Sequence, residues 1–140
     1  MILEHYKAFT GLLEGVQGLP AIEEVARVTD SGEPVRANYV VAFPPRIPSL
    51  RDERYTVAQS ALSTARFRFD VRPVGTTATT VLRFTDLILA ATVGTPLVVD
   101  GRVCDSMRLV EGVEEGAAEY DRTARLYYQD FTIEVISRRI

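Results

Sequence analysis

The chain of 140 residues contains no tryptophan, one cysteine, one histidine and one lysine. Because Cys104 is alone, an intrachain disulfide is excluded, as is typical of a protein made in a reducing compartment. With His5 as the single histidine, a zinc site built from histidine and cysteine within one chain is excluded as well. No run of about 18 apolar residues occurs, so the sequence predicts no membrane-spanning helix.

The composition is that of a globular protein, with 46% hydrophobic and 25% charged residues. The length suits a single domain over residues 1–140. The net charge of −3 argues against a general nucleic-acid binder. The charge is uneven, because residues 34–72 hold 7 arginines against 3 acids, whereas residues 111–140 hold 4 arginines against 7 acids.

Apolar residues at helical spacing predict two helices. The first covers residues 2–14 and ends before Gly15, Gly18 and Pro20, which do not continue a helix. Its apolar stripe consists of Ile2, Tyr6, Phe9, Leu13 and Val16. The second covers residues 77–91, with Thr76 or Thr77 as its N-cap. Its apolar face consists of Val81, Phe84, Leu87, Ile88 and Ala91.

The clearest strand precedes the second helix, where Phe67, Phe69 and Val71 alternate with charged residues. Further strands are predicted at 37–43, 106–111 and 126–137, and a hairpin at 97–104 with a type I′ turn at Asp100-Gly101. Segment 21–29 fits a helix or a strand. The order predicts an α+β fold: an antiparallel or mixed sheet with two helices packed on one face.

No motif in the chain assembles a catalytic centre. The corner VGTTATT has one glycine, Gly75, and no lysine, so it fits a capped strand–helix junction better than a phosphate loop. His5 is expected to have a surface or half-buried structural role, and Cys104 to be a small core residue. Glu114 and Glu115 fit solvated charge or a partner surface better than a cation site. We therefore expect no enzyme activity, no cofactor and no metal site.

Five short features occur in a characteristic order over about residues 37–139. They are Tyr39-Val40-Val41, Pro44-Pro45, Val74-Gly75-Thr76-Thr77, Val99-Asp100-Gly101-Arg102, and Tyr127-Tyr128 leading to Asp130. In this order they resemble the tail terminator, or tail completion, proteins of long-tailed (siphovirus-type) bacteriophages, above all those of phages that infect actinobacteria.

The resemblance implies a structural protein of the virion tail or neck, assembled in the host cytoplasm. Such proteins form a ring, usually a hexamer, on the last layer of the tail tube. The ring ends tube polymerisation and provides the surface that joins the tail to the head connector or stopper protein. DNA passes through the hole without specific binding, and no catalysis, cofactor or membrane is involved.

Two segments are expected to form contacts in such a ring. A long loop at about 44–60, rich in proline and arginine, is predicted to touch a neighbouring subunit or the tube. Its candidate residues, with two from the charged strand face, are Pro44, Pro45, Arg46, Arg51, Arg54, Arg66 and Arg68. An acidic loop at about 111–122 fits either the arginine-rich segment of the next subunit or the wall of the channel. Its residues are Glu111, Glu114, Glu115, Glu119 and Asp121.

Three other functions stay open on the sequence alone. One is a neighbouring head–tail neck or connector protein. Another is a small cytoplasmic α+β binding or regulatory domain that forms a dimer. The third is a small enzyme whose site is completed at a subunit interface.

Overall fold

The computed structural model describes residues 2–46, 64–112 and 118–140. The element order is α1 (Ile2–Glu14), β1 (Ile22–Glu23), β2 (Tyr39–Ala42), β3 (Thr64–Gly75), α4 (Ala78–Thr92), β4 (Arg102–Cys104), β5 (Arg108–Gly112), β6 (Glu119–Asp121), β7 (Leu126–Tyr128) and β8 (Phe131–Arg139). These elements form two helices and one mixed sheet, which confirms the α+β class.

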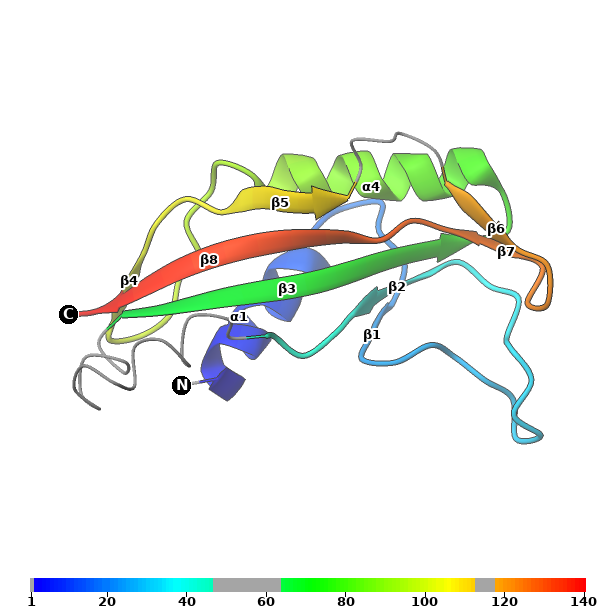
Figure 1. Cartoon of the computed structure of the whole chain (residues 1–140), viewed down its shortest axis with the longest axis horizontal. Helices are drawn as coiled ribbons and strands as arrows, with labels where there is room; N and C mark the ends of the chain where they lie inside the picture. The colour runs from blue at the N-terminus through cyan, green and yellow to red at the C-terminus, as the bar shows by residue number, and fades with distance from the viewer. Residues whose placement is uncertain (1, 47–63, 113–117) are drawn as a thin grey trace.

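The sheet is organised around the long strand β3. On one side β3 pairs with β2, and on the other side with β8 and then β7, all antiparallel. β8 in turn pairs with β4 and β5, β6 pairs with β7, and β1 adds to β2 as the parallel pair. Figure 1 shows β3 and β8 running side by side through the centre of the molecule, with α4 above them and α1 behind.

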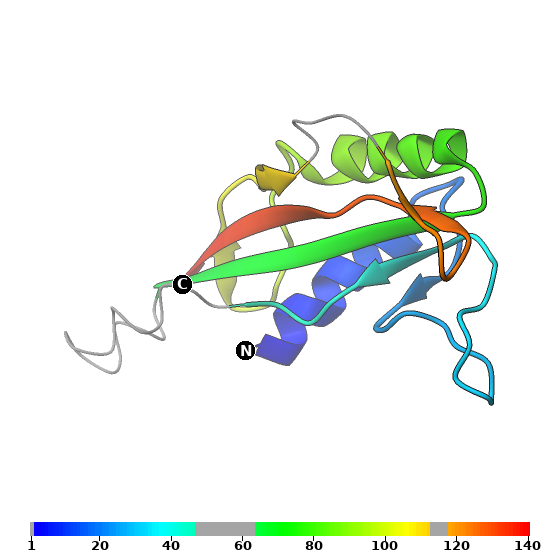
Figure 2. The same ribbon diagram turned by 45° about the vertical axis from the view of Figure 1, so that its right-hand side comes forward.

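The alternating sequence of β3 gives the sheet two different faces. Phe67 and Phe69 are fully buried, and α1 packs on them: His5 stacks on Phe67 with ring centroids 4.2 Å apart, and Phe9 on Phe69 at 4.3 Å. Ile88 of α4 belongs to the same core cluster. The turned view in Figure 2 shows α1 crossing behind β3. The arginines of β3 alternate with the phenylalanines, so they lie on the opposite, outer face.

The helix boundaries follow the capping signals in the sequence. Thr77 is the N-cap of α4, because its side chain accepts a hydrogen bond from the Thr80 backbone N–H at 3.2 Å. Gly94 follows α4 with a φ of 83°, which a residue with a side chain rarely adopts. The sequence therefore predicted both helices to within one residue at each end.

The segment after α4 differs from the predicted hairpin at 97–104. Arg102–Cys104 is a strand, but it pairs with β8, and Leu97–Val99 forms no strand. A turn does occur, since the Arg102 N–H donates to the Val99 carbonyl at 3.1 Å. Gly101 has a φ of 74°, whereas Asp100 is not among the described residues with positive φ, so the turn is not type I′. Long-range pairing with β8 prevailed over the local hairpin.

One more segment departs from the prediction, and the structure decides between the two alternatives for another. The expected final strand at 126–137 is divided into β7 and β8, with Gln129 and Asp130 between them, because β3 pairs first with one and then with the other. The ambiguous segment 21–29 contributes the two-residue strand β1 and then leaves the sheet. The chain then reverses direction in a turn that is closed by the isolated bridge between Val28 and Pro34.

Gly75 lies at the corner between β3 and α4, where its neighbours are closely packed. A Cβ atom at Gly75 would lie 3.2 Å from the γ-methyl groups of Thr80 and Val81 and 3.3 Å from the Asn38 amide oxygen. That oxygen accepts a hydrogen bond from the Thr76 N–H, so it cannot move freely. We expect Gly75→Ala to lower the free energy of unfolding by about 1–2 kcal/mol, measured by urea denaturation.

The matched control is Gly11→Ala in α1, where an added Cβ meets nothing within 4 Å. This change should raise the free energy of unfolding by about 0.5–1 kcal/mol, because alanine favours a helix interior. Equal effects of the two substitutions would contradict the packing assigned to the corner.

Candidate functional site

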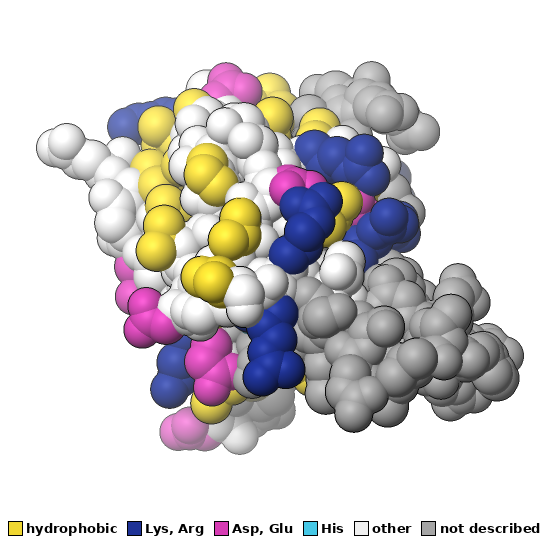
Figure 3. All heavy atoms as spheres, turned by 90° about the vertical axis from the view of Figure 1, so that its left-hand side faces the viewer, with side chains coloured by type: hydrophobic (Ala, Val, Ile, Leu, Met, Phe, Trp, Pro, Cys, Tyr) yellow, Lys and Arg dark blue, Asp and Glu magenta, His cyan; other side chains and the backbone are white. Residues whose placement is uncertain are grey.

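The outer face of the sheet carries five arginines and three carboxylates among the described residues. We call it the arginine face and define it by Arg46, Arg66, Arg68, Arg72 and Arg108. In Figure 3, where the front of Figure 1 is turned to the right-hand side, dark blue side chains gather on that side with magenta ones among them.

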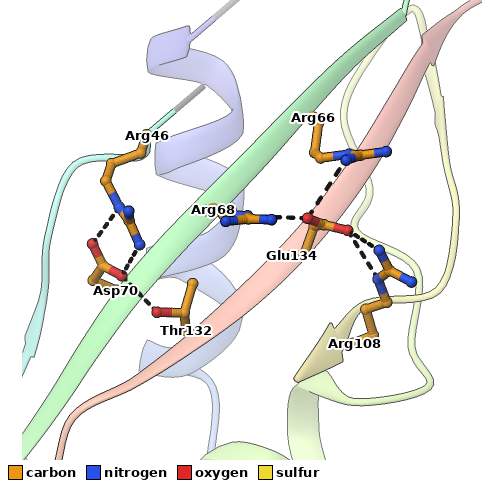
Figure 4. Close-up of polar contacts among 7 residues, drawn as sticks. All are labelled: Arg46, Arg66, Arg68, Asp70, Arg108, Thr132 and Glu134. Atoms are coloured by element: carbon orange, nitrogen blue, oxygen red, sulfur yellow. Dashed lines mark hydrogen bonds and ion pairs between the residues drawn. The ribbon is translucent and has the colours of Figure 1, made fainter. Parts of the chain in front are cut away.

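At the centre of this face, three arginines surround one carboxylate. Arg68 donates from Nε to Glu134 Oε2 at 3.1 Å, and Arg108 donates from Nε to Oε1 at 2.9 Å. The Nε of Arg66 lies 3.8 Å from Oε2 as an ion pair. Figure 4 shows the three guanidinium groups converging on Glu134 from β3 and β5. The register places them there, because Glu134 lies opposite Arg68 on one side and Arg108 on the other.

The cluster combines a buried carboxylate with exposed cations. The Glu134 side chain is 0% exposed, whereas the side chains of Arg66 and Arg108 are 43% and 61% exposed. Within the described residues, the guanidinium groups of three arginines face the single carboxylate of Glu134. Glu134 thus holds the strands together, and the arginines present the remaining positive charge to the outside.

The arginines also determine the ionisation of Glu134. Burial by itself raises the pKa of this carboxyl group, but hydrogen bonds from Arg108 and Arg68 outweigh it and hold the pKa below its ordinary value of 4.5. A carboxyl group whose pKa is lower in the folded chain stabilises the fold above its unfolded-state pKa. That stabilisation is lost as the pH falls through the folded-state value.

The lowered pKa of Glu134 predicts how the stability of the fold changes in acid. The difference in free energy of unfolding between the parent and Glu134→Gln should be constant near neutral pH and shrink as the pH falls below about 4.5. Urea denaturation of both proteins over a pH series measures it, and the subtraction removes the contribution of the other carboxylates. A difference that does not change with pH would show that the charge of Glu134 has no part in stability.

Two further ion pairs extend the arginine face along β3. Arg46 holds the Asp70 carboxylate through two hydrogen bonds of 2.8 Å, and the Thr132 hydroxyl donates to the same carboxylate at 2.7 Å. Arg72 holds Asp130 at 2.6 and 3.0 Å. These carboxylates neutralise Arg46 and Arg72, whereas within the described residues the arginines outnumber the carboxylate at the Glu134 cluster.

A second polar cluster lies inside the molecule, between α1 and β8. The Nε2 atom of His5 lies 2.8 Å from the Ser137 hydroxyl, whose oxygen accepts a hydrogen bond from Arg102 Nε at 2.8 Å. A serine next to a histidine can form a nucleophile and a base. Here both side chains are 0% exposed, and Arg102 already donates to the serine oxygen, so the cluster ties α1 to the sheet. The expected surface or half-buried position of His5 is therefore wrong, whereas a structural role fits.

The structure places some of the predicted contact residues and leaves others outside its description. Arg46 forms an antiparallel bridge with Arg68, so Pro44, Pro45 and Arg46 run beside β3. Arg51 and Arg54 lie outside the described residues. The structure therefore brings Arg46, Arg66 and Arg68 together on one face.

Both ends of the predicted acidic loop belong to strands. Glu111 lies in β5, and Glu119 and Asp121 lie in β6, because β6 pairs with β7. The hydroxyl of Tyr128 donates to Glu119 at 2.6 Å, and Asp121 accepts from the Thr123 N–H at 2.9 Å. Glu114 and Glu115 lie outside the described residues.

Glu134 is the residue that the sequence interpretation missed. In the stretch FTIEVIS, the apolar residues Phe131, Ile133 and Val135 identified the inner face, and the same alternation places Glu134 on the outer face. A lone acid on the outer face of an apolar strand was the available signal. Its arginine partners depend on the pairing of strands far apart in the sequence.

The rest of the described chain offers no metal site or membrane span. No group of three or more histidine, cysteine, aspartate or glutamate side chains in residues 2–46, 64–112 and 118–140 could hold a metal ion. Within the same residues, no helix is both long and apolar enough to cross a membrane. Cys104 is a free, half-buried thiol at the edge of the core.

Known proteins resemble this chain in fold, not in detectable sequence family. No protein-family model matches the chain, and no curated protein matches its sequence. Among solved structures, the fold is similar to that of a chain in the virion of a native gene transfer agent (GTA) particle. The TM-score is 0.61 at 14% sequence identity, and the match covers 99% of this chain and 94% of the other. The two chains share a fold over almost their whole lengths.

Proposed function

We propose that this protein is a structural component of a phage-like particle, and that within the particle it caps the tail tube. In this role several copies, six in our proposal, form a ring on the last layer of the tube. The ring ends tube polymerisation and provides the surface to which the head connector or stopper protein binds. DNA passes through its centre.

The observation that carries the particle assignment is the fold shared with a chain of the GTA virion. The match extends over 99% of this chain and 94% of the other, so it concerns a whole protein and not a common substructure. The proposed location at the end of the tail is supported by the sequence and not by the fold. It rests on the order of the YVV strand, the proline pair, the Val-Gly-Thr corner, the Val-Asp-Gly-Arg turn and the final aromatic strand.

The charged groups of the fold suit a structural protein. Glu134 is held by arginines and Asp70 by Arg46 and Thr132, so both carboxylates join neighbouring strands, and the serine–histidine pair is buried. These groups link the strands of the sheet and leave a charged outer face. A subunit with a charged face is suited to an assembly in which the same contact repeats between neighbours.

Native mass spectrometry and negative-stain electron microscopy of the purified protein test this proposal. We expect one discrete species at six times the mass of the 15.6 kDa chain, visible as a ring with a central hole. A stable dimer without a hole would favour the regulatory domain instead. A protein that stays monomeric at all concentrations would contradict the ring.

A further inference from the structure

The side of the molecule opposite the arginine face carries an acidic groove, which we define by Glu14, Glu23 and Glu24. The groove lies between α1 and β1, has a volume of about 160 Å³, and is also lined by Leu3 and Lys7. Leu3 is 56% exposed. Glu23 is paired with Arg27 at 3.3 Å, whereas no ion pair within the described residues involves Glu14 or Glu24. The groove therefore keeps a net negative charge.

The surrounding segment has the same sign. Residues 2–36 contain 6 acidic residues and 3 lysine or arginine residues, a net charge of −3. The arginine face has its excess of arginines at the Glu134 cluster, on the far side of the sheet from α1, where Arg66 and Arg108 are exposed. Two surfaces on opposite sides of one subunit cannot pair within that subunit. They can pair between two copies arranged head to tail.

We infer that the arginine face of one copy binds the acidic groove of a second copy, with Arg66 and Arg108 as the cations and Glu14 and Glu24 as their partners. This inference deepens the proposed ring, on which it rests, because it names the two surfaces that meet. Opposite charges across such a contact fix the orientation of the partners and speed their association.

The composition of the arginine face favours a protein carboxylate over DNA as the occupant. Asp70, Asp130 and Glu134 alternate with the arginines, and Arg46 and Arg72 are each neutralised by one of them. A duplex presents a continuous row of phosphates, and these acids would repel it. A few separate carboxylates from a neighbour fit the small area of excess positive charge at the Glu134 cluster.

Two charge reversals, Arg66→Glu and Glu24→Arg, test the contact. Arg66 suits the test because its 3.8 Å contact with Glu134 is the longest of the three, so the fold should tolerate its loss better than that of Arg68 or Arg108. Each reversal alone should weaken self-association by about tenfold or more, measured by sedimentation at low salt. Circular dichroism shows whether each variant is folded. The control Arg83→Glu, on the exposed side of α4, should associate like the parent.

Combining the two reversals distinguishes direct pairing of Arg66 with Glu24 from a general effect of charge on association. The double variant R66E/E24R should associate within about threefold of the parent, because every contact again joins opposite charges. A mixture of the two single variants should also assemble, in alternation, since each altered face then meets the complementary altered groove. Association of the parent should weaken as salt is raised.

Several outcomes would overturn the inference. If the parent forms rings and the single variants form them equally well, the assigned surfaces are wrong while the proposed function stands. Absence of rescue in both the double variant and the mixture would also reject the pairing. Loss of binding to a duplex DNA probe in R66E, with self-association unchanged, would assign the face to DNA. A parent that never associates would contradict both the inference and the ring.

Discussion

Replacing Phe69 with alanine should lower the free energy of unfolding by about 3–5 kcal/mol. The Phe69 side chain is fully buried and stacks on Phe9 of α1 with ring centroids 4.3 Å apart and planes 7° apart. It belongs to the core cluster that includes Ile88 of α4 and Ile133 of β8. Removing its ring leaves a cavity between α1 and the sheet, and close-packed neighbours refill such a cavity only partly.

Urea denaturation followed by circular dichroism measures the loss, and Val98→Ala is the matched control. Val98 is 86% exposed, so its truncation removes little buried surface and should change stability by less than about 0.5 kcal/mol. If Phe69→Ala unfolded at the same urea concentration as the parent, the assignment of the inner face of β3 as the core would be wrong.

Replacing Glu134 with glutamine should cost about 3 kcal/mol, because the guanidinium groups of Arg66, Arg68 and Arg108 would then face one another without a counter-charge. Glutamine keeps the shape of the side chain, so the loss reports the charge. We place the value at the lower end of the range for buried pairs, since Arg66 and Arg108 are partly in water.

The control for Glu134→Gln is Asp105→Asn. Asp105 is paired with Arg138 by two hydrogen bonds, but both side chains are largely exposed, at 42% and 50%. Solvent screens such a pair, so the control should show little change in stability. Sulfate added to the Glu134→Gln variant should restore part of the loss by binding between the arginines. Equal stability of Glu134→Gln and the parent would mean that the cluster contributes nothing to folding.

The sequence predicted those parts of the fold that depend on local pattern. The apolar stripe of residues 2–14 and the threonine cap at 77 defined the helices to within one residue. The alternation around Phe67 and Phe69 predicted a strand with one apolar and one charged face. These features are encoded by neighbours in the chain, and the structure confirms them.

The remaining features depend on which strands meet, and no local pattern determines this. Arg68 was recognised as a face residue, but its partner Glu134 lies 66 residues further along the chain. His5 was expected at the surface or half buried, because its full burial depends on Ser137, which is 132 residues away. The predicted hairpin at Asp100-Gly101 gave way to pairing with β8 for the same reason.

The tail-capping role itself is tested most directly by removing the gene from a genome that encodes a complete particle and measuring tail lengths by electron microscopy. Without a cap the tube continues to polymerise, so we expect tails that exceed the normal length and vary widely, together with heads that carry no tail. Supplying the parent protein from a plasmid should restore tails of uniform length joined to heads. Tails of normal, uniform length attached to heads in the absence of this protein would contradict the account.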